Sequence, residues 1–185
     1  KSEQPAWLAT VPPPNGYRGE YRYGTPDIGP KYAAKIDGAI ATLSERGQGA
    51  AAWLCDVIFD SNGTILPPPG YLEYTAPAIR AAGGLYIADE VQSGFYRTGD
   101  EMWGYSYADA VPDIVTLGKP IGDGHPIGAV ITPPAIAAKF AKKFSYFNTF
   151  GGNPVSAAVG MAVLDVLERE GVQQNVIAAG QVLEP

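Results

Sequence analysis

The sequence has few of the residues that build cross-links, metal sites and membrane spans. Cys55 is its one cysteine and His125 its one histidine, so an internal disulfide is excluded and a metal site is poorly supported. No apolar run approaches the ~20 residues that span a bilayer, and no export signal opens the chain. We therefore expect a soluble protein with no metal and no membrane partner. A single cysteine within an apolar run suits a cytoplasmic location.

Basic charge is also scarce. There are 13 Lys and Arg against 19 Asp and Glu, which gives a net charge of −6. The basic residues are scattered, so the chain lacks the positive patch that binds nucleic-acid backbones. The aromatic and arginine residues of the segment 17–23 are better explained by docking on the protein's own surface or on a partner subunit than by base stacking. We predict no nucleic-acid partner.

What is present is typical of a globular chain with one core. The sequence has 185 residues, of which 46% are hydrophobic and 17% charged. It begins at Lys1 rather than at a methionine, and it stops shortly after a predicted helix. We expect a piece of a longer polypeptide.

Apolar patterns predict alternating strands and helices. Residues 1–30 are rich in Pro, Gly and Tyr and are predicted to be an extended surface segment. Apolar runs predict strands over residues 50–59, 85–88, 114–117 and 127–131, and the first of these is expected to end near residues 56–60. Periodicity and capping residues predict helices over residues 31–46, 71–82 (kinked at Pro77), 134–143 and from 154 to just before Gly171. This order predicts an α/β fold with a mainly parallel sheet and flanking helices.

Two of the predicted strands end in a charged residue. The run GGLYIADEVQSGFYRTG leads to Asp89, and DIVTLGKP leads to Lys119. The carboxyl ends of parallel strands form the edge where ligands bind in open α/β sheets. A lysine there can form a Schiff base, and an aspartate can keep the nitrogen of a pyridoxal phosphate ring protonated. An ordinary Lys–Asp ion pair explains the spacing alone at least as well.

Three sequence motifs bear on the choice between these two explanations. They occur in the order IADEVQSGFYRTG, PDIVTLGKPIGDGHPIGAVI and FNTFGGNPVSAAVGMAVLDVLERE. Together they resemble the class III aminotransferases, which are pyridoxal phosphate enzymes of fold type I. The resemblance is clearest from Ala50 to Glu170, and YRGEYRYG near the start is also similar to that family. The segment GKPIGDGHP is most similar to the branch of the family that contains the phospholyases.

The resemblance implies a role for five residues. Lys119 and Asp89 would be catalytic: Lys119 would hold pyridoxal 5′-phosphate as a Schiff base and act as general base, and Asp89 would pair with the pyridinium nitrogen. Val91 would pack on one face of the ring, and Gln92 would bind its 3′ oxygen. Thr149 would bind the cofactor phosphate of the neighbouring subunit, which implies a homodimer or a larger assembly.

The implied activity is transfer of an amino group from an amine or amino acid to a keto acid. A phospholyase reaction of the same family is the alternative. The sequence departs from the family at Asp56-Val57, where many relatives have Glu-Pro, and at Tyr96, where they usually have Gly. The family's glycine-rich phosphate cup and small C-terminal domain are also missing, so a catalytically silent fragment or interaction module is a further alternative.

The resemblance divides the chain into three parts: an extended segment (1–30), a partial cofactor-binding large domain (31–152), and a helix leading toward a missing small domain (153–185). It also makes a geometric prediction. The charged atoms of Asp89 and Lys119 should lie several ångströms apart across a cavity, and a direct salt bridge would argue against a shared cofactor. Glu90, next to Asp89, should face the other side of its strand in a structural role.

Overall fold

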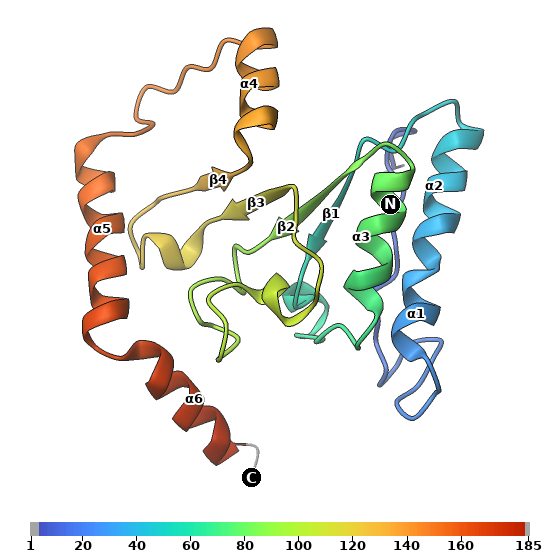
Figure 1. Ribbon diagram of the computed structural model, residues 1–185, viewed down its shortest axis with the longest axis horizontal. Helices are drawn as coiled ribbons and strands as arrows, with labels where there is room; N and C mark the ends of the chain where they lie inside the picture. Colours follow the sequence, from blue (N-terminus) through green and yellow to red (C-terminus); the bar gives the residue numbers. More distant parts are fainter. Residues whose placement is uncertain (1–3, 184–185) are drawn as a thin grey trace. The chain divides into compact units, whose positions relative to one another are not determined.

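A computed structural model describes residues 4–183 as an α/β fold with a mostly parallel mixed sheet and flanking helices, as predicted (Figure 1). Its strands are β1 (Ala52–Asp56), β2 (Leu85–Asp89), β3 (Ile114–Leu117) and β4 (Ala129–Ile131). Its α-helices are α1 (Ile28–Ala33), α2 (Lys35–Glu45), α3 (Tyr71–Ala81), α4 (Pro134–Lys143), α5 (Pro154–Arg169) and α6 (Val172–Leu183). Short 3-10 turns are η1 (Asp60–Asn62), η2 (Gly104–Tyr107) and η3 (Lys119–Ile121).

The chain forms two compact units. The first contains the residues up to Ala88 together with Tyr105–Pro112, and the second contains Asp89–Gly104 together with the residues from Asp113 onward. None of the helices in the described part of the chain is long and apolar enough to cross a membrane.

The hydrophobic core belongs to the first unit. Helices α1, α2 and α3 pack on one another, and β1 and β2 are neighbouring strands. Alternate residues of β1 and β2 are buried, which is the period of a strand with one covered face. Trp53 of β1 stacks on Tyr86 of β2 with ring centroids 5.0 Å apart. The sheet and helices therefore share one apolar cluster, which includes Tyr32, Ile36, Cys55, Tyr71, Leu72, Ile79 and Ala88.

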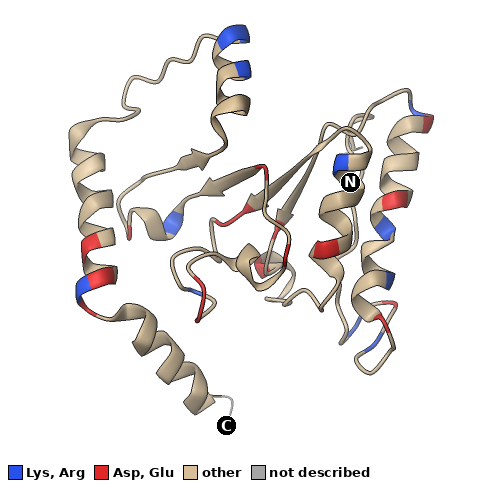
Figure 2. Cartoon of the chain, viewed as in Figure 1, with Lys and Arg blue, Asp and Glu red and all other residues tan. Residues whose placement is uncertain are grey.

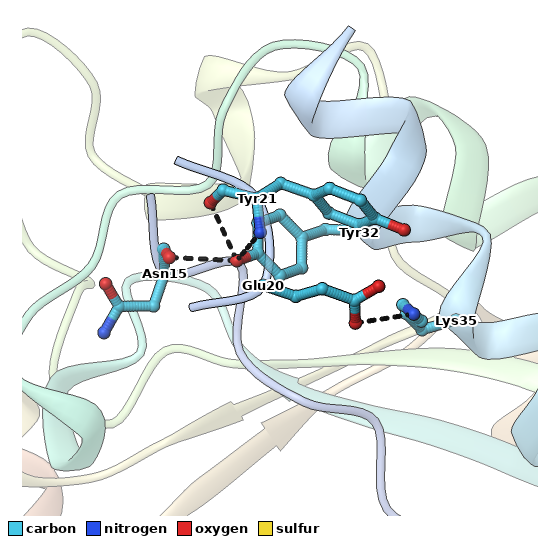
Figure 3. A network of polar contacts seen from close by, with 5 residues as sticks. All are labelled: Asn15, Glu20, Tyr21, Tyr32 and Lys35. Carbon is cyan, nitrogen blue, oxygen red and sulfur yellow. Dashed lines mark hydrogen bonds and ion pairs between the residues drawn. The ribbon is translucent and has the colours of Figure 1, made fainter. Parts of the chain in front are cut away.

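The segment before α1 is anchored by a polar network rather than simply extended (Figure 3). The buried hydroxyl of Tyr32 accepts the N–H of Tyr21 at 3.0 Å and bonds to the carbonyl oxygens of Asn15 and Tyr21 at 2.9 and 3.0 Å. Glu20 and Lys35 form an ion pair of 2.8 Å. Their hydrogen bond lowers the pKa of Glu20 and raises the pKa of Lys35. The segment thus docks on the chain's own α1 and α2 through a series of turns.

Two element predictions in this unit were wrong in detail. The single helix predicted over 31–46 is two helices that meet at Ala34, where the N–H of Asp37 bonds to the Ala34 carbonyl in a tighter turn. The strand predicted over 50–59 starts two residues later, at Ala52, and ends at Asp56, the first residue of the range in which its end was expected. The carboxylate of Asp56 accepts the N–H groups of Ile58 and Asp60 at 3.2 and 2.7 Å, which turns the chain out of the sheet.

In the second unit β3 and β4 pair antiparallel, with Thr116 opposite Val130. The strand predicted over 127–131 is shorter and starts at Ala129, because Pro126 and Gly128 weaken its beginning. The boundaries predicted for β3 and α4 are confirmed. Figure 2 shows that α4 carries basic residues toward its C-terminal end, where they complement the helix dipole.

Helix α5 begins at the predicted cap. The side chain of Asn153 accepts the N–H of Ser156 at 2.9 Å, and Pro154 occupies the first turn. The structure adds helix α6, which starts after Gly171 and was not predicted. Helices α4, α5 and α6 contain no buried residues. Their apolar side chains, and those of the loop between α4 and α5, are left at the surface.

Candidate active site

Four of the five residues with predicted roles lie at the ends of two strands within the second unit. Asp89 is the last residue of β2, and Val91 and Gln92 follow it directly. Lys119 follows β3 after one glycine. The backbone N–H of Glu90 donates to the carbonyl of Thr116 at 3.0 Å, which aligns the end of β2 with β3. The two strand ends therefore meet, as predicted.

The carboxylate of Asp89 is held through only one of its oxygens. Its Oδ1 accepts the N–H of Val91 at 3.0 Å and the hydroxyl of Thr116 at 3.2 Å. No hydrogen bond to Oδ2 occurs among residues 4–183. Two donors on one oxygen fix the orientation of the carboxylate, so its second oxygen is available to a donor from outside the chain.

Lys119 is paired with an uncharged side chain. Its amine donates a hydrogen bond of 2.8 Å to Oε1 of Gln92, and its side chain is exposed. Within the described residues Lys119 and Asp89 form no ion pair shorter than 4.0 Å. The ordinary Lys–Asp ion pair considered from the sequence is therefore not formed. Lys119 also has a φ of 26°, a backbone conformation that is uncommon for a residue other than glycine.

A close backbone approach brings Val91 beside Lys119. A Cβ atom placed on Gly118 would lie 3.1 Å from Cγ1 of Val91, which is tighter than ordinary van der Waals contact. Glycine at position 118 thus lets the side chain of Val91 sit against the chain that carries Lys119.

Glu90 has the structural role expected of it. Its side chain is fully buried and accepts the hydroxyl of Ser93 at 2.6 Å and the N–H of Gly104 at 2.9 Å. These bonds connect the two ends of the loop after Asp89. The rings of Phe95 and Trp103, with centroids 5.4 Å apart, pack inside the same loop.

Phe95 and Tyr96 of the same loop both have an unusual backbone conformation, with a φ of 63°. This left-handed conformation suits glycine, the residue that the family resemblance led us to expect in place of Tyr96. Tyr96 lines a cavity of about 710 Å³. The rest of its wall comes from neighbouring loop residues, the turn after Lys119, and the apolar faces of α5 and α6.

Thr149 is not connected by hydrogen bonds to the other residues with predicted roles. It is exposed in the loop between α4 and α5, and none of the hydrogen bonds in the described chain joins it to Asp89, Gln92 or Lys119. The loop is ordered by Asn148, whose Oδ1 accepts the N–H groups of Phe150 and Gly151 at 3.1 and 3.0 Å.

His125 also takes part in a local contact. Its Nε2 lies 2.9 Å from the hydroxyl oxygen of Ser156 in the first turn of α5. In the described part of the chain no three His, Cys, Asp or Glu side chains are grouped so that they could hold a metal ion.

Thr116 was not among the site residues predicted from the sequence. The sequence did contain a signal for this residue: a threonine between the apolar residues Val115 and Leu117, which are buried, lies on the less buried face of β3. What the sequence did not show is that strand pairing places its hydroxyl next to Asp89.

Comparison with known proteins agrees with the motifs. The sequence profile of the family Aminotransferase class-III matches residues 24–185. An alanine–glyoxylate aminotransferase 2-like protein of Drosophila melanogaster is 43% identical over 184 residues, which are 97% of this chain and 37% of that protein. The chain thus spans little more than a third of that relative.

Solved structures show the same fold. A phospholyase from Arthrobacter, in complex with phosphoethanolamine, matches with a TM-score of 0.78 and 46% identity over 84% of this chain and 37% of that one. Taurine:2-oxoglutarate aminotransferase from Bifidobacterium kashiwanohense, in complex with PLP and glutamate, matches with a TM-score of 0.81 and 29% identity over 92% of this chain and 39% of that one. On the evidence of the profile match and these likenesses, the chain belongs to the class III aminotransferase family.

Proposed function

We propose that the protein containing this chain is a pyridoxal phosphate-dependent aminotransferase that transfers an amino group from an amine or amino acid to a keto acid. The observation that carries the proposal is the arrangement at the two strand ends. Lys119 offers an exposed amine held by the neutral Gln92, while Asp89 keeps one carboxylate oxygen free. A buried Lys–Asp ion pair would have left neither group available.

The residues present fit the cofactor. The free Oδ2 of Asp89 is a suitable acceptor for the proton on the ring nitrogen. Gln92 uses its oxygen for Lys119, so its amide NH₂ remains to donate to the 3′ oxygen of the ring. Val91 offers an apolar side chain for one face of the ring. The ring nitrogen, the 3′ oxygen and one face of the ring thus each have a partner of the matching kind among these residues.

The cofactor and the residues of the chain would supply different parts of the reaction. Pyridoxal phosphate supplies an aldehyde that condenses with amines and a ring that withdraws electrons from the substrate carbon. With the cofactor bound, Lys119 would hold its aldehyde through the amine and, once a substrate amine had replaced it, would act as the general base that takes the proton from the substrate carbon. Asp89 would hold the proton on the ring nitrogen, and Gln92, which already accepts the hydrogen bond of the lysine amine, would orient that amine.

We also propose that the active form is a homodimer or a larger assembly, with Thr149 serving the cofactor phosphate of the neighbouring subunit. Two observations support this. Thr149 is exposed in a loop without a hydrogen bond to the rest of the group. The aromatic residues beside it, Phe147 and Phe150, are 85% and 78% exposed, which is unusual for large apolar side chains that have no partner. A cytoplasmic location and the domain boundaries at residues 30 and 152 stay predictions.

A phospholyase reaction is the second candidate. It is favoured by the 46% identity to the Arthrobacter phospholyase, whose structure contains phosphoethanolamine. The same lysine and aspartate would serve in it, because loss of a proton from the substrate carbon can be followed by expulsion of phosphate instead of transfer of nitrogen.

The test uses the full-length protein with pyridoxal phosphate. We expect a visible absorbance band, and borohydride reduction should fix the cofactor to the peptide that contains Lys119. Lys119→Ala should abolish both, whereas Lys142→Ala, which changes an exposed lysine of α4, should retain them. Absence of the band in the wild type, together with unchanged behaviour of Lys119→Ala, would support a silent interaction module and overturn the proposal.

Product analysis then separates the two reactions. Formation of an amino acid from an added keto acid supports the aminotransferase. Release of phosphate and ammonia from phosphoethanolamine without any keto acid supports the phospholyase and rules against transamination as the main activity.

A further inference from the structure

Thr116 makes the one side-chain hydrogen bond that Asp89 accepts within the described residues. The hydroxyl of Thr116 lies 3.2 Å from Oδ1 of Asp89, and the other donor to that oxygen is the backbone N–H of Val91. The contact joins residues 27 positions apart, so the strand pairing creates it and local turn geometry does not.

The geometry of the two strands accounts for the contact. Val115 and Leu117 are buried while Thr116 is half-buried, and Ala88 and Glu90 are buried while Asp89 is half-buried. Side chains alternate between the faces of a strand, so Thr116 and Asp89 project on the less buried face of their strands. The bond from the Glu90 N–H to the Thr116 carbonyl fixes the register that brings them together.

A hydroxyl in this position can also fix the orientation of the carboxylate that it bonds to. A carboxylate that accepts one backbone hydrogen bond can still rotate, so that either oxygen accepts it. A second donor on the same oxygen removes that freedom and leaves Oδ2 as the oxygen that faces other partners. A neutral donor achieves this without an opposite charge that would compete with a cationic ligand for the carboxylate.

We propose that Thr116 is a positioning residue for Asp89: together with the Val91 N–H, its hydroxyl holds Oδ1 so that Oδ2 meets the protonated ring nitrogen of the cofactor. This inference rests on the proposed function. Thr116 itself need not touch the cofactor, and it acts through the orientation of Asp89.

The test compares three variants of the full-length protein loaded with pyridoxal phosphate. Thr116→Val removes the hydroxyl at nearly constant shape, Thr116→Ser keeps a hydroxyl, and Thr132→Val is the matched control. Thr132 is a half-buried threonine of the same unit whose hydroxyl donates to the carbonyl of Asp113 at 3.0 Å rather than to a carboxylate. Cofactor affinity and the pH dependence of the cofactor's visible bands are measured in each.

We expect Thr116→Val to weaken cofactor binding about tenfold, because a hydrogen bond that orients a charged group is lost. We also expect the pH at which the visible bands interchange to rise by about half a unit. A ring nitrogen that has lost its proton no longer opposes protonation of the lysine–cofactor linkage. Thr116→Ser should restore both values toward those of the wild type, and Thr132→Val should leave them unchanged.

The outcomes separate this inference from the proposed function. If the wild type shows no visible band with the cofactor, the proposed function fails and this inference fails with it. If the wild type binds normally and Thr116→Val matches it in affinity and pH profile, only the inference is overturned. Should Thr116→Val not fold, as judged by circular dichroism, Thr116→Ala and Thr116→Ser form the deciding pair with the same readouts.

Discussion

The amine of Lys119 and the side-chain oxygen of Gln92 are joined by a hydrogen bond of 2.8 Å between two chain segments that follow different strands. Because Gln92 carries no charge, this bond orients the amine without an ion pair that an incoming aldehyde would have to break. A carboxylate at the same position would hold the amine more strongly, since hydrogen bonds between charged partners are about twice as strong as neutral ones.

Gln92→Glu tests this relationship. We expect the full-length variant to capture pyridoxal phosphate about tenfold more slowly, because the new ion pair must be broken first. Stopped-flow recording of the visible band measures the rate. Gln173→Glu is the control, because Gln173 is a residue of α6 whose side chain donates to a backbone carbonyl far from Lys119 in the sequence. Equal capture rates in wild type and Gln92→Glu would contradict the assigned role of the neutral partner.

Glu90→Ala tests how the loop after Asp89 is held. The substitution leaves the Ser93 hydroxyl and the Gly104 N–H without their buried acceptor, so we expect the free energy of unfolding to fall by about 1–3 kcal/mol. Glu90→Gln retains an acceptor oxygen and should lose less. Denaturant unfolding measures both, with the exposed Glu168→Ala as control. An equal loss in the Ala and Gln variants would show that the two hydrogen bonds are not what stabilises the loop.

Burial of the Tyr71 side chain leads us to expect a loss of stability at alkaline pH. Its side chain is 1% exposed, and burial, assisted by the neighbouring Cys55, raises the pKa of Tyr71 well above its ordinary value of 10.0. The folded state therefore favours the neutral phenol. The resulting stabilisation is fully present below pH 10 and is lost as the pH rises above that value, where the unfolded chain ionises first.

The measurement is the free energy of unfolding between neutral and strongly alkaline pH. In Tyr71→Phe, which has no phenol to ionise, the decline above pH 10 should be shallower than in the wild type. Tyr17→Phe changes a tyrosine that is 68% exposed and should follow the wild-type curve. If all three curves coincide, ionisation of Tyr71 does not limit alkaline stability.

Elements that depend on nearby residues were predicted well. The bounds of β3 and α4 and the cap at Asn153 follow from apolar runs, from proline and from one polar side chain, all of which are visible within a few positions. The end of β1 was predicted only to within residues 56–60, because the Asp56 carboxylate bonds to the backbone two and four residues later. Such competition between side chain and sheet is not visible in a hydrophobic pattern.

The candidate site was predicted in its residues but not in its contacts. Asp89 and Lys119 were identified by their positions after apolar runs, and the resemblance to a family supplied Val91, Gln92 and Thr149. The partners Thr116 of Asp89 and Gln92 of Lys119 each lie 27 residues away in the sequence. Such contacts are fixed by strand register, which a single sequence does not determine.

The positions of the tryptophans have a practical consequence. Trp53 is stacked on Tyr86 in the hydrophobic core. Trp103 instead packs on Phe95 in the loop after Asp89, whose two ends are joined by the hydrogen bonds of Glu90. Indole fluorescence responds to its immediate surroundings, so variants that lack the exposed Trp7 and retain only one of these two residues would report on different events. Emission from Trp53 would follow melting of the core, and emission from Trp103 would follow the loop next to the carboxylate of Asp89, which gives separate optical signals for these two parts of the protein.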